Sequence, residues 1–323
     1  MTLTVRRFAL EDADAWDEFC SGCLQTTFLH TRRFLSYHGN RFDDASLIVE
    51  RDGACVGLFA AAVAPWLKSM VVSHPGLTYG GIVHRGALRG ESMVQALRAI
   101  CDHYAEAGFE RLLYKAVPSI YHRAPAQDDL YALFRLRFNR TRCDLSCAID
   151  LSHRLPVSQR RLRGAKKALK NGVQVACGRM YAAPIWDVLQ ANLKNRFDAK
   201  PVHTLAEITL LSDRFPENIR FVCAMLESEV VAGVVLFETS HVTHAQYIAS
   251  SDEGYRICAL DLIFDSCIDT ASKAGKRWFD FGISNENAGQ FLNEGLYEFK
   301  SNFGGGGIVH EFYESDLAMK DAP

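Results

Sequence analysis

The sequence predicts an α/β protein with mixed sheets, built as two similar units in tandem. Two β-hairpins lie far apart in the chain, at residues 47–63 and 220–239, and the same order of elements follows each of them. That order is strand, helix, Ala-Gly and strand, and the copies are offset by about 170 residues. We therefore expect two domains, residues 1–155 and residues 156–323.

The first hairpin is marked by Asp52-Gly53 between two β-rich runs, which is the strongest short hairpin signal in a sequence. A strand-like stretch follows at residues 70–81. A helical period then runs over residues 91–107 up to an Ala-Gly pair, and a strand is predicted at residues 112–117. These elements make up the first copy.

The second hairpin turns at a polar Glu-Ser-Glu segment. A strand at residues 244–251, a helix at residues 259–273, the pair Ala274-Gly275 and a strand at residues 278–283 follow it. Between the copies, residues 158–172 predict a highly basic helix with Ser158 as its cap and Asn-Gly at its end. We place the domain boundary at this helix.

Composition and motifs exclude several functional classes. The chain has 323 residues with 36 basic and 38 acidic side chains, a net charge of -2, so its overall charge does not indicate a nucleic-acid or membrane partner. Its ten cysteines include one C-x-x-C pair, Cys20 and Cys23, without a second pair for zinc, so we expect reduced thiols and no metal. No signal-peptide run or membrane-spanning stretch occurs, which predicts a cytoplasmic location.

Motifs for other enzyme classes are also missing. There is no G-x-S-x-G elbow, H-E-x-x-H motif or Walker loop, which argues against a hydrolase, a zinc enzyme or a kinase. The acidic pair Asp128-Asp129 is typical of a helix N-terminus rather than of paired catalytic acids.

The layout of each copy resembles the GNAT acyltransferase fold. Two such copies, joined by R-x-x-x-x-K-K-A-x-K-x-G-V (Arg161–Val173) and ending in G-L-Y-x-F-K-x-x-F-G-G (Gly295–Gly305), are similar to the Fem-type, tandem-GNAT branch. The resemblance extends over nearly the whole chain. It implies a cleft between the domains and an acyl-donor site in the second domain.

The same resemblance assigns roles near the C-terminus. Lys300 matches the lysine that Fem-type enzymes use next to the reacting amine, and Phe299 matches the residue whose carbonyl lies beside it. The four glycines from Gly304 to Gly307 would let the chain turn beside a bound ligand. A lone lysine on an amphipathic strand exposed to solvent is the alternative for Lys300.

The GNAT donor loop, usually Q/R-x-x-G-x-G/A, corresponds to Ser251–Ala259, where Cys258 stands in place of a second glycine. Gly254, Arg256 and the free N–H groups of the following helix predict an anion site for acyl-CoA. The predicted cofactor-binding residues are Gly254, Tyr255, Arg256, Ile257, Cys258 and Ala259.

Acyl transfer from a thioester to an amine requires a neutral amine, a polarised carbonyl and a proton for the leaving thiolate. A histidine is the usual base, and three stand in loops rich in proline, glycine and aromatic residues: His74, His122 and His203. For His74 the alternative is a turn histidine bonded to a backbone carbonyl. We expect Lys300 and one of these three to handle the proton and the oxyanion.

Further residues are candidates for binding the acceptor. Tyr79 and Gly80 could form a floor for a sugar or base, or a strand end with a bulge. Asp280 is either a pocket residue or a buried structural carboxylate. The basic helix is either a solvated face or a phosphate clamp. The predicted substrate-binding residues are Tyr79, Gly80, Tyr121, Arg161, Lys166, Asp280 and Phe299.

The stretches H-P-G-L-T-Y-G-G, V-P-x-I-Y-H and P-V-H-T-L-x-E-I are similar to bacterial acyl-CoA-dependent N-acyltransferases that modify nucleotide-linked amino sugars for surface polysaccharides. We therefore expect a dTDP- or UDP-linked amino sugar as acceptor and acyl-CoA as donor. One alternative is an aminoacyl-tRNA-dependent peptidyltransferase of peptidoglycan precursors. Another is a non-catalytic fold that binds a sugar nucleotide or a partner protein. The acyl chain, the sugar and the oligomeric state stay open.

Overall fold

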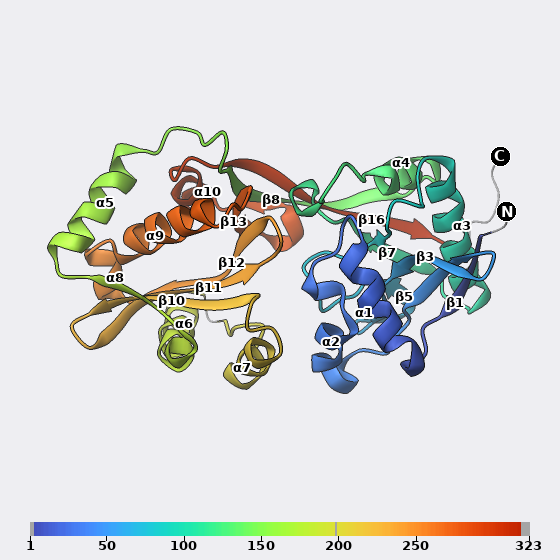
Figure 1. Cartoon of the computed structure of the whole chain (residues 1–323), viewed down its shortest axis with the longest axis horizontal. Coiled ribbons are helices and arrows are strands. Elements are labelled where there is room, and N and C mark those ends of the chain that lie inside the picture. Colours follow the sequence, from blue (N-terminus) through green and yellow to red (C-terminus); the bar gives the residue numbers. More distant parts are fainter. Residues whose placement is uncertain (1–2, 198, 318–323) are drawn as a thin grey trace. The chain divides into compact units, whose positions relative to one another are not determined.

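The computed structural model describes residues 3–197 and 199–317, and these fall into two compact units (Figure 1). Unit 1 comprises Met1–Asp144, Asn287–Phe291 and Val309–Pro323, and unit 2 comprises Leu145–Glu286 and Leu292–Ile308. The chain therefore returns to unit 1 twice after it enters unit 2. The division into domains at residues 155 and 156 stays a prediction.

Unit 1 contains seven strands and four α-helices that lie wholly in its described part. The strands are β1 (Leu3–Arg7), β2 (Leu47–Arg51), β3 (Ala54–Phe59), β4 (Ala62–Ala64), β5 (Leu67–Val72), β6 (Ile82–Val83) and β7 (Arg111–Lys115). The helices are α1 (Ala13–Gly22), α2 (Arg32–Leu35), α3 (Glu91–Glu106) and α4 (Asp128–Arg135). Short 3-10 helices are η1 (Leu10–Asp12), η2 (Phe28–His30), η3 (Ser36–Arg41), η4 (Ser119–Tyr121) and η6 (Asn287–Gly289).

Unit 2 is built on a sheet in which β12 (Val242–Ser250) has a central place. The other elements are β9 (Gln174–Cys177), β10 (Ile219–Leu226), β11 (Glu229–Glu238), β13 (Trp278–Ile283), β14 (Asn285–Glu286), η5 (Arg179–Tyr181), α5 (Gln159–Lys170), α6 (Ala182–Phe197), α7 (Leu205–Arg214), α8 (Asp252–Arg256), α9 (Ala259–Lys273) and α10 (Glu294–Ser301). Three strands have residues in both units: β8 (Asn139–Asp150), β15 (Phe291–Leu292) and β16 (Gly306–Asp316).

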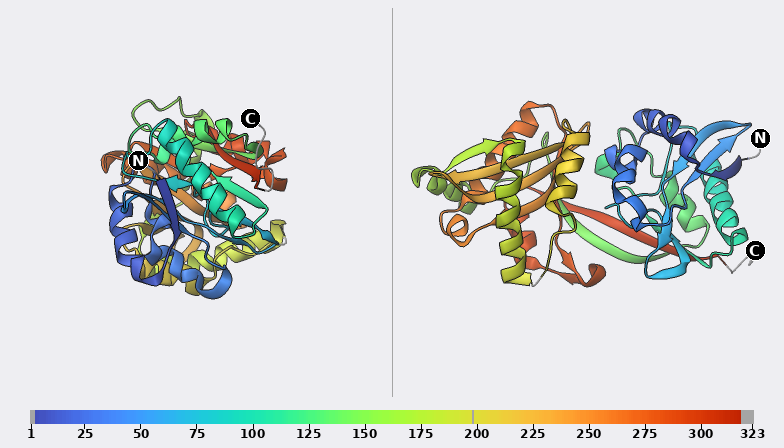
Figure 2. Two further views of the ribbon diagram at one scale, coloured as in Figure 1. Left: turned by 90° about the vertical axis from the view of Figure 1, so that its right-hand side faces the viewer. Right: turned by 90° about the horizontal axis from the view of Figure 1, so that it is seen from below.

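The sheet of unit 2 has the order β8-β13-β12-β11-β10-β9 and carries helices on both faces (Figure 1). Helix α9 packs on one face through a core that includes Ile263, Phe264 and Phe279, while α6 packs on the other (Figure 2). Gly233 of β11 allows this second contact, because a Cβ there would lie 2.7 Å from a side-chain carbon of Ile185. Both faces of the central strands are therefore covered.

Unit 1 carries the antiparallel order β1-β2-β3-β6, and separately pairs β5 with β7 in parallel and β7 with β16 antiparallel. Helix α3 contributes Met93, Leu97 and Ile100 to a core shared with Val49 and Phe59. Burial of this apolar stripe explains the helical period seen in the sequence.

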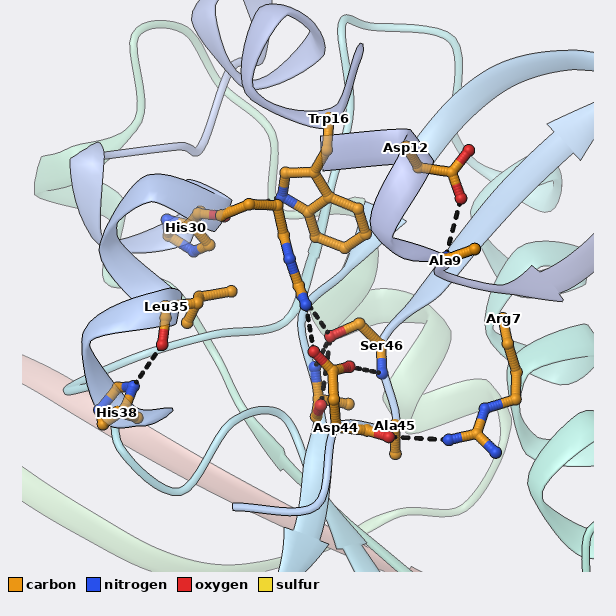
Figure 3. Close-up of polar contacts among 12 residues, drawn as sticks. Arg7, Ala9, Asp12, Trp16, His30, Leu35, His38, Asp44, Ala45 and Ser46 are labelled. Carbon is orange, nitrogen blue, oxygen red and sulfur yellow. Dashed lines mark hydrogen bonds and ion pairs between the residues drawn. The ribbon is translucent and has the colours of Figure 1, made fainter. Parts of the chain in front are cut away.

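Polar contacts fix the start of unit 1 (Figure 3). The Asp44 Oδ1 atom accepts the N–H of Ser46 at 2.7 Å, and the Asp44 carbonyl oxygen accepts a bond from Arg7 at 2.7 Å. The indole N–H of Trp16 donates to the carbonyl of His30 at 2.9 Å. These bonds tie β1 to the turn that precedes β2, and α1 to η2.

The predicted mixed α/β architecture is confirmed, and several elements lie where the sequence placed them. The Asp52-Gly53 turn has positive φ at both residues, +52° and +80°, as a two-residue hairpin turn requires. Ser158 caps α5 by accepting the N–H of Arg161, and α9 runs over residues 259–273 as predicted. The strand expected at residues 70–81 is shorter, because β5 ends at Val72 and a turn with His74 at φ +53° follows.

Each unit contains a parallel strand pair with three paired residues. Residues 70–72 of β5 pair with residues 111–113 of β7, and residues 242–244 of β12 pair with residues 278–280 of β13. In unit 2 the strand β12 continues to Ser250 after this pairing ends. Among the described helices, none combines the length and the apolar character needed to cross a membrane.

Candidate active site

Asp280 of β13 is the centre of a polar network in unit 2. Its carboxylate is completely buried and its Oδ1 accepts bonds from the Ser146 hydroxyl at 2.5 Å and the Gly282 N–H at 3.0 Å. Its Oδ2 lies 2.8 Å from Nδ1 of His244. The Ser146 hydroxyl and the Gly282 N–H thus compensate part of the hydration that this buried carboxyl group loses.

Strand register brings Asp280 and His244 together. They are the last of the three residue pairs between β12 and β13, so their side chains lie on the same face of the sheet. Phe279 and Phe281, on either side of Asp280, point into the apolar core against Phe264. The alternation that buries the two phenylalanines therefore aims Asp280 at the opposite face, where α6 packs.

Lys300 lies in α10 and is 3% exposed, so the strand alternative for this residue is wrong. Its Nζ donates to the carbonyl oxygens of Gly282 at 3.0 Å and Ile283 at 2.6 Å. Burial lowers the pKa of Lys300 to about 8, although Asp280 and Cys147 act in the opposite direction. A buried ammonium group thus lies at the end of β13, near the Asp280 carboxylate.

Phe299 packs into the same region. Its ring centroid is 6.0 Å from that of Phe264 and 5.4 Å from that of Phe303, and the Arg161 guanidinium carbon lies 4.8 Å above it. The side chain of Phe299 therefore anchors α10 to the core. A role for its carbonyl beside the reacting amine stays a prediction.

The glycine run after α10 brings the chain close to its own backbone. At Gly304, with φ +90°, a Cβ would lie 2.3 Å from the carbonyl oxygen of Leu155. At Gly305 it would lie 2.7 Å from the sulfur of Cys147 on β8. Gly304 and Gly305, which connect α10 to β16, are thus needed for packing against Leu155 and Cys147, and a ligand is not required to explain them.

His203 lies between α6 and α7 and is buried against Tyr247 of β12. The Tyr247 hydroxyl accepts the backbone N–H of His203 at 3.2 Å and is also bonded to the ring nitrogen Nδ1 of His203. Burial raises the pKa of Tyr247 to about 12. Tyr247 projects from the same face of β12 as His244, because a β-bulge in the pairing with β11 shifts the alternation between them.

The predicted donor loop forms a short helix, α8. The Gly254 N–H is bonded to the Ser251 hydroxyl at 3.1 Å, and a Cβ at Gly254 would lie 2.3 Å from the carbonyl oxygen of Val231. Gly254 therefore serves packing. Cys258 precedes α9 as its N-cap residue, in the left-handed conformation at φ +62°. The N–H groups of Ala259 and Leu260 have no partner within α9 by helix geometry.

The other predicted members of this stretch are accounted for as follows. Arg256 is exposed and paired with Glu253 at the i,i+3 spacing. Tyr255 is exposed and Ile257 is buried in the core. An anion bound at the start of α9 would thus accept hydrogen bonds from the N–H groups of the first turn of α9. The exposed guanidinium group of Arg256 could add a charged contact.

The basic helix α5 packs against α9, and one residue that the sequence assigned to phosphate binding, Arg161, lies in this contact. Arg161 is buried and forms an ion pair with Asp261 in the first turn of α9. Gly164 makes room for it, because a Cβ there would lie 2.1 Å from Asp261 Oδ2. Lys166 is exposed, whereas Lys167 donates to the Arg256 carbonyl at 2.6 Å. Phosphate binding by Arg161 would require this pair to open.

The remaining predicted histidines lie in unit 1. His74 is buried in its turn, where Nδ1 accepts the Gly76 N–H at 3.2 Å, and burial lowers its pKa well below the usual value. His122 is half-buried and its Nε2 lies 3.0 Å from the Val117 carbonyl oxygen. Both have the backbone contacts of turn histidines, and their catalytic roles stay predictions.

Tyr79, Gly80 and Tyr121 also lie in unit 1 and are packed tightly. The rings of Tyr79 and Tyr121 are 4.6 Å apart and both are buried. The Gly80 N–H donates to the carbonyl of Lys115, and a Cβ at Gly80 would lie 2.2 Å from the Ser73 carbonyl oxygen. The loop of residues 73–81 thus closes over the end of β7 in unit 1.

Lys115 marks a difference between the two units. It is buried at the end of β7, its Nζ donates to the carbonyls of His74 and Leu77, and burial lowers its pKa to about 7. The corresponding position in the register of β13 is Gly282. In unit 1, Lys115 and the loop of residues 73–81 therefore fill the position that corresponds to the polar network of unit 2.

Sequence reasoning missed His244, Ser146 and Gly282. His244 stands inside a predicted strand, and Ser146 stands in β8, 134 positions before Asp280. The one sequence signal was Asp280 itself, an acidic residue alternating with aromatic ones. The described residues contain no group of three or more His, Cys, Asp or Glu side chains arranged to hold a metal ion.

Comparisons with known proteins agree with this architecture. Residues 157–301 match the family described as Acetyltransferase (GNAT) domain. The fold is similar to the crystal structure of FemX, with a TM-score of 0.66, 14% identity and coverage of 97% of each chain. No curated protein matches the sequence.

Two further solved structures are similar over most of their lengths. L-PGS from Bacillus licheniformis has a TM-score of 0.61 at 12% identity and covers 94% of this chain and 91% of its own. A tandem GNAT protein from the clavulanic acid biosynthesis pathway has a TM-score of 0.51 at 12% identity and covers 99% and 100%. At these identities the likeness concerns the fold, and the predicted tandem GNAT fold is confirmed.

Proposed function

We propose that this chain, an N-acyltransferase of the GNAT superfamily, transfers an acyl group from acyl-CoA to the amino group of a dTDP- or UDP-linked amino sugar for surface polysaccharide biosynthesis. The amine attacks the thioester directly, since a thioester is reactive enough without a covalent enzyme intermediate. The observation that carries the proposal is the polar network of Asp280, His244 and Lys300, which lies in the GNAT-matched part of the chain where β12 leaves β13.

The end of the β12–β13 pairing supports the placement of the donor. Beyond His244, β12 continues to Ser250 and is no longer paired with β13. A strand edge of this kind offers backbone N–H and C=O groups to an extended ligand that carries amides. The pantetheine arm of CoA is such a ligand, and its pyrophosphate would reach the first turn of α9 with Arg256.

Lys300 supports the chemical step. At neutral pH its amine is mostly charged, because burial lowers its pKa only to about 8. A positive charge held in a buried site stabilises negative charge that develops on a thioester oxygen or a leaving thiolate. Its bonds to the Gly282 and Ile283 carbonyls hold it in place before the substrate arrives.

A second candidate is aminoacyl transfer, in which an aminoacyl-tRNA replaces acyl-CoA. The likeness to FemX and to L-PGS favours this reading. The exposed lysines and arginines of α5 suit phosphates of either donor or acceptor, so they do not separate the two. The donor must therefore be identified by experiment.

Thermal shift with a ligand panel tests the proposal. A ligand at 100 times its dissociation constant stabilises a protein by about 2.7 kcal/mol. Stabilisation by acetyl-CoA or a longer acyl-CoA, followed by mass spectrometric detection of an acylated nucleotide sugar, is the expected result. Transfer that RNase abolishes and that does not depend on CoA would favour the aminoacyl-tRNA reading. Stabilisation by a nucleotide sugar without any transfer would favour a binding protein.

A further inference from the structure

The imidazole of His244 is held in one orientation and one protonation pattern. Its Nδ1 lies 2.8 Å from Oδ2 of Asp280, whose other oxygen already accepts bonds from Ser146 and Gly282. An ionised carboxylate can only accept hydrogen bonds, so when Asp280 is ionised the proton of the neutral ring is on Nδ1. The lone pair of the ring is therefore on Nε2.

The Nε2 atom of His244 is open to solvent. The side chain is 12% exposed, and in the described part of the chain Nε2 is neither hydrogen-bonded nor among the buried polar atoms. A histidine that served only to join β12 to β13 would need no more than the contact of its Nδ1 atom. His244 also presents the basic Nε2 atom, at the point where the pairing of the two strands ends.

We infer that His244 is the general base that deprotonates the acceptor amine, and that Asp280 positions it. The inference rests on the proposed acyl transfer. Nε2 takes a proton from the amine, whose nitrogen forms the C–N bond to the thioester carbon. The C–S bond breaks, the thiolate leaves with the electron pair, and the proton passes from His244 or from water to the thiol. The carboxylate of Asp280 stabilises the imidazolium that exists between these events.

Other titratable groups surround this pair. Lys300 approaches from α10 and Cys147 from β8, both close enough to interact electrostatically with one another, and Lys300 also interacts with Asp280. Tyr247 lies further along the same face of β12 with His203 bonded to it. Gly282 confines the ring, because a Cβ there would lie 3.3 Å from Cε1 of His244. None of these groups forms a hydrogen bond with Nε2 of His244 in the described part of the chain.

The tautomer of His244 is the first test, because it does not depend on activity. Nitrogen NMR of the wild-type chain labelled at histidine should show the Nδ1–H form for the neutral ring, with His244→Asn used for assignment. The Nε2–H form would overturn the inference. An Asp280→Asn change should convert the ring to the Nε2–H form, since the new amide donates where the carboxylate accepted.

Kinetics with acetyl-CoA and UDP-glucosamine as probes provide the second test. His244→Asn keeps a donor for Asp280 but lacks the base, so kcat should fall by about 100-fold or more while the KM for acetyl-CoA changes little. The acid limb of the pH–rate profile should disappear with it. Asp280→Asn should lower kcat in the same way, and His153→Asn, at an exposed histidine of unit 2, serves as the control.

The outcomes separate the inference from the proposed function. A His244→Asn variant that keeps the wild-type kcat and acid limb would overturn the role of His244 and leave acyl transfer intact. A wild-type chain that moves no acetyl group to this amine would contradict the proposed function together with the inference. A kcat loss accompanied by loss of acetyl-CoA stabilisation in thermal shift would mean a collapsed site, which also counts against the assigned role.

Discussion

The Nζ atom of Lys300 lies 3.0 Å from the carbonyl oxygen of Gly282, and this bond joins α10 to the end of β13. The Gly282 N–H is bonded on its other side to Asp280. One residue with φ +77° thus connects the buried ammonium to the buried carboxylate. Substitutions at these positions have separable effects on stability and activity.

Lys300→Met should change how stability depends on pH. In the native chain the pKa of Lys300 is lowered from 10.5 to about 8, so between these values the unfolded chain binds a proton that the native chain releases. The unfolding free energy of the wild type should therefore rise relative to the variant by about 3 kcal/mol from pH 8 to pH 10.5. Denaturant titrations at several pH values measure this difference.

Wild type must be compared with Lys300→Met because buried cysteines change the unfolding free energy in the opposite direction as the pH rises. Burial raises the pKa of Cys147 to about 12, which lowers stability above pH 9 in both chains. Lys273→Met, at an exposed lysine of α9, is the matched control. A constant difference between wild type and Lys300→Met over this range would contradict a lowered pKa.

Gly282→Ala should reduce activity by more than its effect on stability explains. A Cβ would strain the backbone at φ +77° and press on the His244 ring, whereas Gly275 has φ +74° with open space around it. Both alanine variants should lose about 1–2 kcal/mol of unfolding free energy from the left-handed conformation. Only Gly282→Ala should also lower kcat, measured beside Gly275→Ala. Equal kcat values in the two variants would rule out the crowding of His244.

Arg161 and Lys166 should differ in what they do. Arg161→Met leaves Asp261 buried without its partner and should cost about 3–5 kcal/mol, while Arg161→Met with Asp261→Leu should recover most of it. Lys166→Met should leave stability unchanged and raise the KM for a nucleotide-linked acceptor. Chemical denaturation and steady-state kinetics measure the two effects. If Arg161→Met raised that KM without loss of stability, phosphate binding by Arg161 would be supported instead.

Unit 1 should lose stability in acid partly through His84. This residue is buried, its Nδ1 accepts the Gly86 N–H at 2.9 Å, and burial lowers its pKa to about 4. Below pH 6.5 the His84 imidazole therefore binds a proton in the unfolded chain but not in the native chain. As a result, the unfolding free energy falls by about 3 kcal/mol as the pH drops from 6.5 to 4. His84→Asn, which can still accept the Gly86 N–H, should fall less steeply over that range. Parallel slopes for the two chains would show that His84 does not contribute.

The sequence by itself determined the local elements and their order. The Asp52-Gly53 turn, the Ser158 cap and the limits of α9 follow from contacts within a few residues, where side-chain size and backbone conformation decide. The repeat of hairpin, strand, helix and strand was visible for the same reason. It led to the tandem fold, whereas the expectation that Lys300 belongs to the site came from the resemblance of Gly295–Gly305 to Fem-type enzymes.

Only the tertiary structure decided which distant side chains meet. His244 and Asp280 are 36 positions apart, and Ser146 is 134 positions from Asp280, so no local pattern relates them. Their contact depends on strand register, because a shift of one residue would turn each side chain to the other face of the sheet. In the same way, the burial of Arg161 against Asp261 depends on the packing of α5 on α9, which a basic helical pattern does not contain.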